Sequence, residues 1–148
     1  MHTITITGKS ATIVEAMRQL LNDDGKTRML VCAASNAAAD LLLKKLSKHL
    51  SPKKMLRVNA TSQNPEKIES KYHRYCLFDQ KKKKKYRFPT LTEIETRQVV
   101  VTTCITAGAV YALGGTKPYT HIFVDEVLII VMLYKILYLT GRKEIFFN

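Results

Sequence analysis

Two short groups of residues in this chain have the types and spacing that phosphate chemistry requires. Gly8, Lys9 and Ser10 stand directly before an amphipathic stretch, and Asp125 and Glu126 follow an apolar run. Backbone N–H groups and a lysine at a helix start bind phosphate oxygens, and the adjacent hydroxyl binds Mg²⁺. An Asp at a strand end can hold the same ion, and a following Glu can polarise the attacking water. Together the groups predict a nucleotide site, whereas each alone also fits a helix start or a solvated turn.

The phosphate-binding pattern G-x-x-x-x-G-K-[ST] is only half present. Its leading glycine would stand at position 3, but the chain has Thr3, followed by the β-branched residues 4–7. Such residues favour extended backbone and resist the positive φ angles that a glycine loop adopts. We therefore expect a strand that runs into Gly8, in place of the first half of the loop.

The balance of charge favours a polyanionic partner. The chain has 148 residues, 46% of them hydrophobic, which is enough for one domain with its own core. Lys and Arg number 24 against 12 Asp and Glu, which gives a net charge of +12. Nucleic acid is preferred over a membrane surface, because phosphate contacts release counterions. The five lysines at 81–85 have a simpler interpretation, a solvated loop.

Cysteine and histidine patterns do not indicate a metal site. Cys32, Cys76 and Cys104 are odd in number and widely spaced, and the four histidines lack metal-ligand spacing. We expect reduced thiols in an intracellular protein. The apolar run 127–139 is shorter than the roughly 20 residues of a membrane helix, so no membrane association is expected.

Alternating apolar runs and amphipathic stretches predict an α/β fold with a mostly parallel sheet flanked by helices. Strands are expected at 28–33, 55–58, 98–104 and 120–126. The first helix is expected to end at 22–25, and its buried stripe is Ile13, Val14, Met17, Leu20 and Leu21. The second is expected to stop at Pro52, with Ser35 or Asn36 as its cap; its buried face is Ala39, Leu42, Leu43, Leu46 and Leu50. Shorter helices are expected near 65–71 and after Cys104.

Four segments carry a specific resemblance. In chain order they read "GKSATIVEAMRQLL", "MLVCAASNAAADLLLKKL", "VVVTTCITAG" and "YTHIFVDE". Together they resemble the first RecA-like domain of a superfamily 1 RNA helicase, of the branch that acts in nonsense-mediated decay and RNA silencing. "RVNA", "YCLFD" and "FP" are similar to the Armitage-like, plant silencing-defective subgroup. The resemblance covers roughly residues 8–126.

The resemblance implies a role for individual positions. For ATP binding it implies Gly8, Lys9, Ser10, Thr12 and Asp125; for Mg²⁺, Ser10 and Asp125; for catalysis, Lys9 and Glu126; and for contact with single-stranded RNA, Ser35, Asn36, Thr102 and Thr103. Small hydroxyl and amide side chains at strand ends suit sequence-independent contact with phosphates. The alternatives are a plain helix cap at Ser35-Asn36 and ordinary strand residues at Thr102-Thr103.

The resemblance also sets the expected organisation. Residues 1–126 are interpreted as an incomplete first RecA-like domain, with a surface insertion at 59–89 that carries the lysine run. Residues 127–148 form an apolar tail outside the helicase pattern. Half of the phosphate loop and the second RecA-like domain are not found, so we interpret the chain as truncated. In this interpretation it is a fragment of an ATP-dependent RNA helicase that is inactive alone, and whether it is an enzyme is left open.

Two other functions are compatible with these residues. One is a non-catalytic, basic RNA-binding fragment. The other is a different P-loop NTPase such as a kinase, which has no reason to carry "SNAAAD". For the leading hypothesis the expected cofactors are ATP and Mg²⁺, and the expected partners are single-stranded RNA and RNA-silencing or RNA-decay proteins. The expected location is the cytoplasm, including RNA granules.

Overall fold

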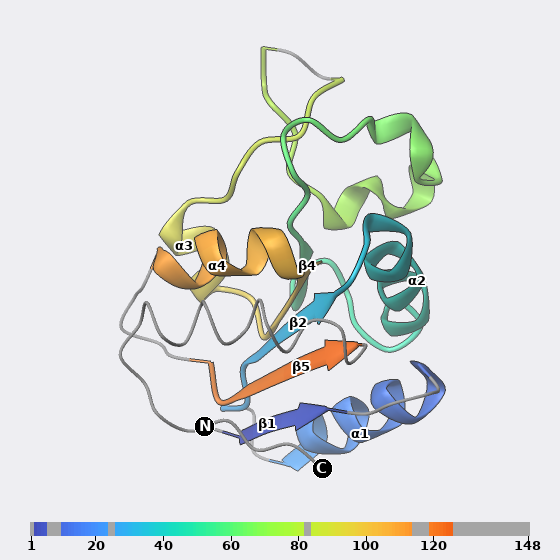
Figure 1. Cartoon of the computed structure of the whole chain (residues 1–148), viewed down its shortest axis with the longest axis vertical. Coiled ribbons are helices and arrows are strands. Elements are labelled where there is room, and N and C mark those ends of the chain that lie inside the picture. The colour runs from blue at the N-terminus through green and yellow to red at the C-terminus, as the bar shows by residue number, and fades with distance from the viewer. Residues whose placement is uncertain (1, 6–9, 24–25, 82–83, 114–118, 126–148) are drawn as a thin grey trace.

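Five parallel strands form the sheet on which the rest of the chain is arranged (Figure 1). The computed structural model describes residues 2–5, 10–23, 26–81, 84–113 and 119–125. For residues 2–5, 10–13, 22–23 and 125 the description covers the backbone alone. Gly8, Lys9, Glu126 and the tail at 127–148 therefore lie outside the described residues.

The predicted α/β class with a parallel sheet is confirmed. The strands are β1 (His2–Thr5), β2 (Met29–Ala33), β3 (Met55–Arg57), β4 (Val99–Thr103) and β5 (His121–Asp125). Their order across the sheet is β1-β5-β2-β4-β3, and every neighbouring pair is parallel. Four strands lie where apolar runs predicted them. β1 confirms that the stretch before Gly8 contains a strand.

Both faces of the sheet are covered by helices, so alternate strand residues enter two different cores. On one face, α1 (Ser10–Asp23) and α2 (Asn36–Leu46) pack over Met29, Val31 and Ala33 of β2. On the other, α3 (Leu91–Glu95) and α4 (Cys104–Ala112) pack over Leu30 and Cys32. Figure 1 shows the two helix layers on opposite sides of the strands. This period of two is what a strand buried on both faces requires.

The second helix ends earlier than predicted. α2 stops at Leu46, although Pro52 was expected to end it. The amide of His49 donates to the carbonyl of Leu46 at 2.9 Å, a tighter turn than an α-helix makes. The five residues predicted for its buried face are all buried, and the last of them, Leu50, lies beyond the helix.

The segment predicted as a surface insertion is attached to the core. It contains two short 3₁₀ helices, Pro65–Lys67 and Ser70–Tyr75, where one small helix was expected. Tyr75 is buried, and its hydroxyl donates to the carbonyl of Leu50 at 2.9 Å. The ammonium of Lys44 on α2 lies 2.8 Å from the carboxylate of Glu69. These contacts fix the segment beside α2.

None of the helices in the described part of the chain has the length and apolar character that a membrane crossing needs.

Candidate functional site

The carboxyl ends of the strands lie along one edge of the sheet, where parallel α/β folds bind ligands. Ala33 of β2 pairs with Thr103 of β4 on one side and with Asp125 of β5 on the other. At the outer strand, Thr5 of β1 pairs with Val124 of β5. The carboxyl ends of neighbouring strands therefore lie side by side. We call this row of strand ends the carboxyl edge.

Three of the predicted nucleotide residues have a described backbone. Ser10 is the first residue of α1, Thr12 lies in its first turn, and Asp125 ends β5. Because β1 and β5 are paired and parallel, Thr5 and Val124 lie beside each other at the same edge. Gly8, Lys9 and Glu126 lie outside the described residues, so their roles stay predictions.

A hydroxyl from Ser10 and a carboxylate from Asp125 are hard oxygen donors, the type that Mg²⁺ prefers. The chemistry of these two donors fits the predicted ion. The positions of the two side chains are not described. Within the described residues, no group of three or more His, Cys, Asp or Glu side chains is placed to hold a metal ion.

Ser35 and Asn36 link β2 to α2 at the carboxyl edge. The Ser35 hydroxyl accepts a hydrogen bond from the amide of Ala38 at 3.1 Å, so Ser35, one of the two predicted candidates, is the helix cap. Both residues are exposed. Their exposure is compatible with the predicted phosphate contact, which stays a prediction.

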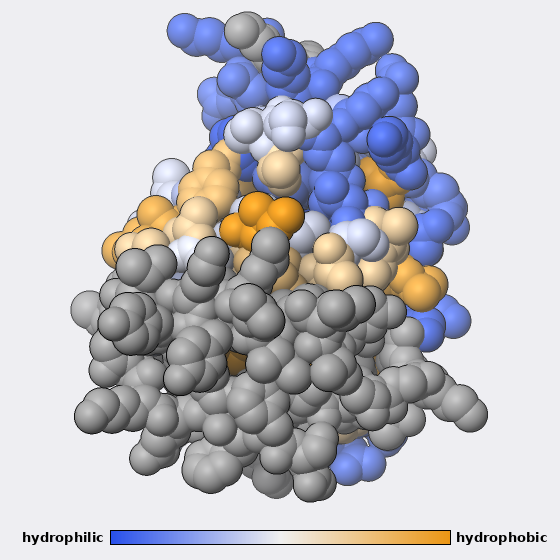
Figure 2. Space-filling model, in the orientation of Figure 1, coloured by the Kyte–Doolittle hydropathy of each residue, from blue (hydrophilic) through white to orange (hydrophobic). Residues whose placement is uncertain are grey.

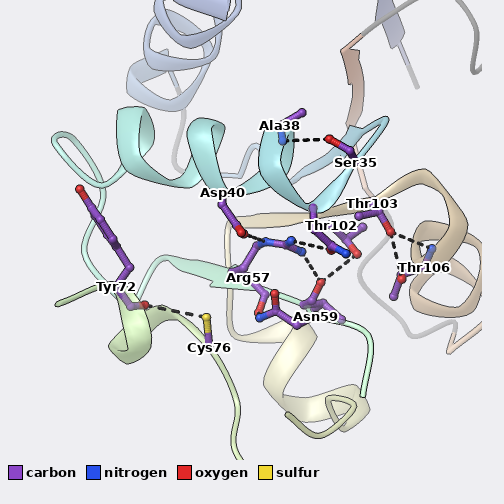
Figure 3. Close-up of polar contacts among 12 residues, drawn as sticks. Ser35, Ala38, Asp40, Arg57, Asn59, Tyr72, Cys76, Thr102, Thr103 and Thr106 are labelled. Atoms are coloured by element: carbon purple, nitrogen blue, oxygen red, sulfur yellow. Dashed lines mark hydrogen bonds and ion pairs between the residues drawn. The ribbon is translucent and has the colours of Figure 1, made fainter. Parts of the chain in front are cut away.

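A buried arginine, which sequence reasoning missed, holds this junction to β3. Arg57 is 0% exposed, and its guanidinium points toward α2 (Figure 3). Its Nε donates to Asp40 Oδ1 at 2.9 Å and its Nη2 to Asn36 Oδ1 at 3.1 Å. Its Nη1 donates to the carbonyl of Val58 at 2.6 Å. One side chain thus sets the position of the Asn36 amide relative to the end of β3.

The two threonines at the end of β4 have different surroundings. Thr102 is fully buried, and its hydroxyl donates to the carbonyl of Val58 at 3.0 Å. In this structure its side chain positions the end of β3 through that hydrogen bond, and the predicted RNA contact at Thr102 stays a prediction. Thr103 caps α4, where its hydroxyl accepts from the amide of Thr106 at 3.4 Å. Thr103 is also buried, with 8% of its surface exposed, and its predicted contact with RNA stays a prediction (Figure 3).

A buried polar group lies behind Arg57. Asn59 is 2% exposed; its Nδ2 donates weakly to the carbonyl of Arg57 at 3.5 Å. Its Oδ1 has no hydrogen-bond partner among the described residues, and neither does the hydroxyl of Tyr86. Burial raises the pKa of the Cys76 thiol to about 11 and also raises the pKa of Tyr86. These groups are held neutral beside the guanidinium.

Comparison with known proteins shows the family to which the chain belongs. Residues 5–88, more than half of the chain, match the AAA domain family. The chain belongs to the AAA domain family. The matched range contains Gly8, Lys9 and Ser10, the α2 cap and Arg57, whereas Asp125 and Glu126 lie beyond it.

The curated relatives of this AAA domain are helicases. The chain is 33% identical over 121 residues to "Putative helicase MOV-10" of Gallus gallus and 39% identical over 123 residues to "RNA helicase Mov10l1" of Homo sapiens. It is 31% identical over 130 residues to "Probable helicase with zinc finger domain" of Homo sapiens. Each match covers 81% of this chain but only 12%, 9% and 6% of these relatives, respectively. No solved structure matches the chain.

These matches support the resemblance to superfamily 1 RNA helicases. They do not distinguish the subgroup, so the Armitage-like assignment stays a prediction. The chain spans about a tenth of the length of these relatives.

Proposed function

We propose that this chain carries part of the ATP-binding domain of an ATP-dependent RNA helicase. In this proposal the carboxyl edge binds Mg²⁺-ATP and single-stranded RNA next to each other. The observation that carries the proposal is the backbone register that pairs Ala33 with both Thr103 and Asp125. That register brings the segments predicted for RNA and for nucleotide to one edge of an AAA domain whose relatives are helicases.

On the nucleotide side, each predicted residue has a distinct task. Gly8 and the start of α1 supply backbone N–H groups to the phosphates, and Lys9 supplies a positive charge. Ser10 and Asp125 supply oxygen ligands to Mg²⁺, and Thr12 lies one turn into the helix. Glu126 orients a water molecule. Mg²⁺-ATP, when bound, supplies the phosphoryl group whose transfer to water drives the helicase.

On the RNA side, the candidates are Ser35, Asn36 and Thr103. Their hydroxyl and amide groups can donate to phosphate oxygens without reading the bases. Thr102 and Arg57 support them from below, because both bind the carbonyl of Val58. Asn36 keeps its amide nitrogen available for RNA while its oxygen accepts from Arg57.

A second candidate function is RNA binding without ATP hydrolysis. Two observations favour it. Thr3 stands where the phosphate pattern requires its leading glycine, and the net charge of +12 serves RNA binding with or without a nucleotide. Under this alternative the carboxyl edge holds RNA alone.

Nucleotide affinity separates the two functions. The purified chain is titrated with a fluorescent ATP analogue, with and without Mg²⁺, and with a labelled single-stranded RNA. The helicase proposal expects Mg²⁺-dependent ATP binding that Lys9→Ala abolishes while RNA binding persists. Lys53→Ala, at an exposed lysine just before β3, is the matched control. RNA binding with no ATP binding favours the alternative, and binding of neither ligand rejects both.

Turnover tests the expectation that the chain is inactive alone. We expect a kcat well below about 1 s⁻¹, the lower end for typical enzymes. RNA-stimulated ATP hydrolysis above that rate, lost in Lys9→Ala, would show that this chain is an active enzyme.

We also propose the finer assignments of the sequence. These are a RecA-like unit at 1–126 with a tail at 127–148, Armitage-like ancestry, and a cytoplasmic place beside RNA-silencing or RNA-decay proteins. Size-exclusion chromatography with and without 127–148 tests the division, because a separate tail can be removed without aggregation of the remainder. Imaging of a tagged chain against an RNA-granule marker tests the location.

A further inference from the structure

A pocket of about 510 Å³ opens within the 60–89 segment, separate from the carboxyl-edge residues. Its volume lies in the range of about 300–1,000 Å³ that small-molecule sites span. The pocket is lined by Asn64, Pro65, Glu66, His73, Phe78 and Lys84. None of these residues has a predicted role. The lining combines two rings, a carboxylate and a lysine.

The rings that line the pocket belong to a fixed row. The ring centroid of Phe78 lies 5.2 Å from that of His73 and 5.1 Å from that of Tyr86. Tyr86 is buried, and its backbone pairs with that of Phe78 as an antiparallel bridge. His73 Nε2 lies 3.1 Å from the carbonyl of Pro65. Phe78 and His73 are each only half-buried, so a ring of this preset row is still accessible to a planar ligand.

Charged groups of both signs line the pocket. Glu66 is exposed at the pocket, so its carboxylate disfavours a phosphate on that side. Lys84 lines the pocket, and Lys81 and Lys85 are exposed next to it in the chain. Figure 2 shows hydrophilic side chains gathered at the end of the molecule where Figure 1 places this segment. A ligand that fits has an aromatic part for the pocket and a phosphate for the lysines.

We propose that this pocket holds a nucleobase of a single-stranded RNA, stacked on the ring of Phe78 beside His73, while the adjoining phosphates lie against Lys81, Lys84 and Lys85. Bases stack on aromatic side chains in sequence-tolerant single-strand binding, and nearby lysines follow the backbone. The inference rests on the proposed RNA binding and adds a second contact point for the strand. The lysine run, which alone reads as a solvated loop, here has a partner.

RNA affinity of matched variants tests the stacking contact. Phe78→Leu keeps an apolar side chain but removes the ring, and we expect it to weaken binding of labelled oligouridine by about five-fold or more. The control is Phe88→Leu, a second half-buried aromatic that does not line this pocket. Equal affinity of Phe78→Leu and the unmodified chain would overturn the proposal.

Salt dependence tests the phosphate contacts. Replacing Lys81, Lys84 and Lys85 by Gln is expected to reduce the slope of log affinity against log salt by about two, since each single-strand phosphate contact contributes about 0.7. The matched control replaces Lys48, Lys53 and Lys54, which are exposed before β3 at the opposite end of the strands. Equal slopes for the two triple variants would overturn the proposal.

Photocrosslinking of the unmodified chain avoids any effect of substitution on folding. Oligonucleotides containing 4-thiouridine are expected to crosslink within residues 64–88. Crosslinks confined to the carboxyl edge would overturn this inference and leave the proposed function intact. Crosslinks in the pocket combined with no effect of Asn36→Ala or Thr103→Val would support the inference and reject the proposed RNA contacts at the edge. Labelling of the pocket by a photoreactive uridine monophosphate, undiminished by excess RNA, would overturn strand binding in favour of a free nucleotide.

Discussion

Arg57, at the end of β3, donates a hydrogen bond from its Nη2 to the side-chain oxygen of Asn36, the first residue of α2, at 3.1 Å. The two residues are 21 positions apart, and β2 and β3 are separated in the sheet by β4. The contact therefore bridges across the sheet at its carboxyl edge. The buried guanidinium of Arg57 thereby holds the Asn36 amide, which is predicted to contact RNA, in place.

Loss of the carboxylate partner of Arg57 is expected to destabilise the chain strongly. Asp40→Ala leaves the buried guanidinium without its counter-charge, and removal of one partner of a buried pair costs about 3–5 kcal/mol. The free energy of unfolding, measured by urea denaturation, should fall by that amount. The double variant Arg57→Met with Asp40→Leu should recover most of it, because both charges are then absent.

The control for this prediction is an exposed pair. Arg18 and Glu15 on α1 are in contact at 2.8 Å, with about half of each side chain exposed. Glu15→Gln should leave the urea midpoint unchanged, since exposed pairs contribute little. Equal effects of Asp40→Ala and Glu15→Gln would show that the Arg57 network is not buried as the structure has it.

The two neighbouring threonines should separate stability from RNA binding. Thr102→Val removes the buried hydrogen bond to Val58 and should lower the free energy of unfolding by about 1 kcal/mol, with no change in the RNA Kd of the folded chain. Thr103→Val removes a helix cap, at a cost of about 0.5–2 kcal/mol, and should also weaken RNA binding. Fluorescence anisotropy, measured well below the unfolding temperature, distinguishes the two. A higher RNA Kd for Thr102→Val than for Thr103→Val would contradict the positioning role of Thr102.

The regular part of the fold could be predicted because apolar periodicity is local. The runs "RMLVCA" and "QVVVTTC" contain β2 and β4, whose residues are buried on both faces. Ser35 or Asn36 was predicted as the cap from their place before an amphipathic stretch, and the cap is Ser35. In each case the signal and its cause lie within a few residues.

The Arg57 network could not be predicted in the same way. Its acceptors Asp40 and Asn36 precede it by 17 and 21 residues, and nothing in "MLRV" indicates where the guanidinium points. The one available signal was an arginine inside an apolar strand, which requires a buried acceptor. The burial of Thr102 and the pocket at Phe78 likewise depend on how distant segments pack. Local secondary-structure propensity carries no information about that packing.

Acid sensitivity should depend on Glu93. Hydrogen bonds from Arg87, at 2.8 Å from Nη1, lower the pKa of Glu93 from 4.5 to about 2, and the Thr90 cap adds to this. Because the pKa is lower in the folded state, the stabilisation is complete above about pH 4.5 and is lost as pH falls toward 2. Urea midpoints measured across that range should fall less steeply for Glu93→Gln than for the unmodified chain. Parallel pH profiles would contradict the contribution of this pair.

The cysteines should be inert until the chain unfolds. All three cysteines are buried and none is paired in a disulfide, and burial raises the pKa of Cys76 to about 11. Since the thiolate is the reactive form, alkylation of Cys76 at pH 8 should be slow in buffer and fast in urea. Mass spectrometry of iodoacetamide-treated chain checks this position by position. Rapid labelling of Cys76 in buffer would mean that the segment carrying Tyr75 and Phe78 opens readily, and the pocket built on that segment would then not be preformed.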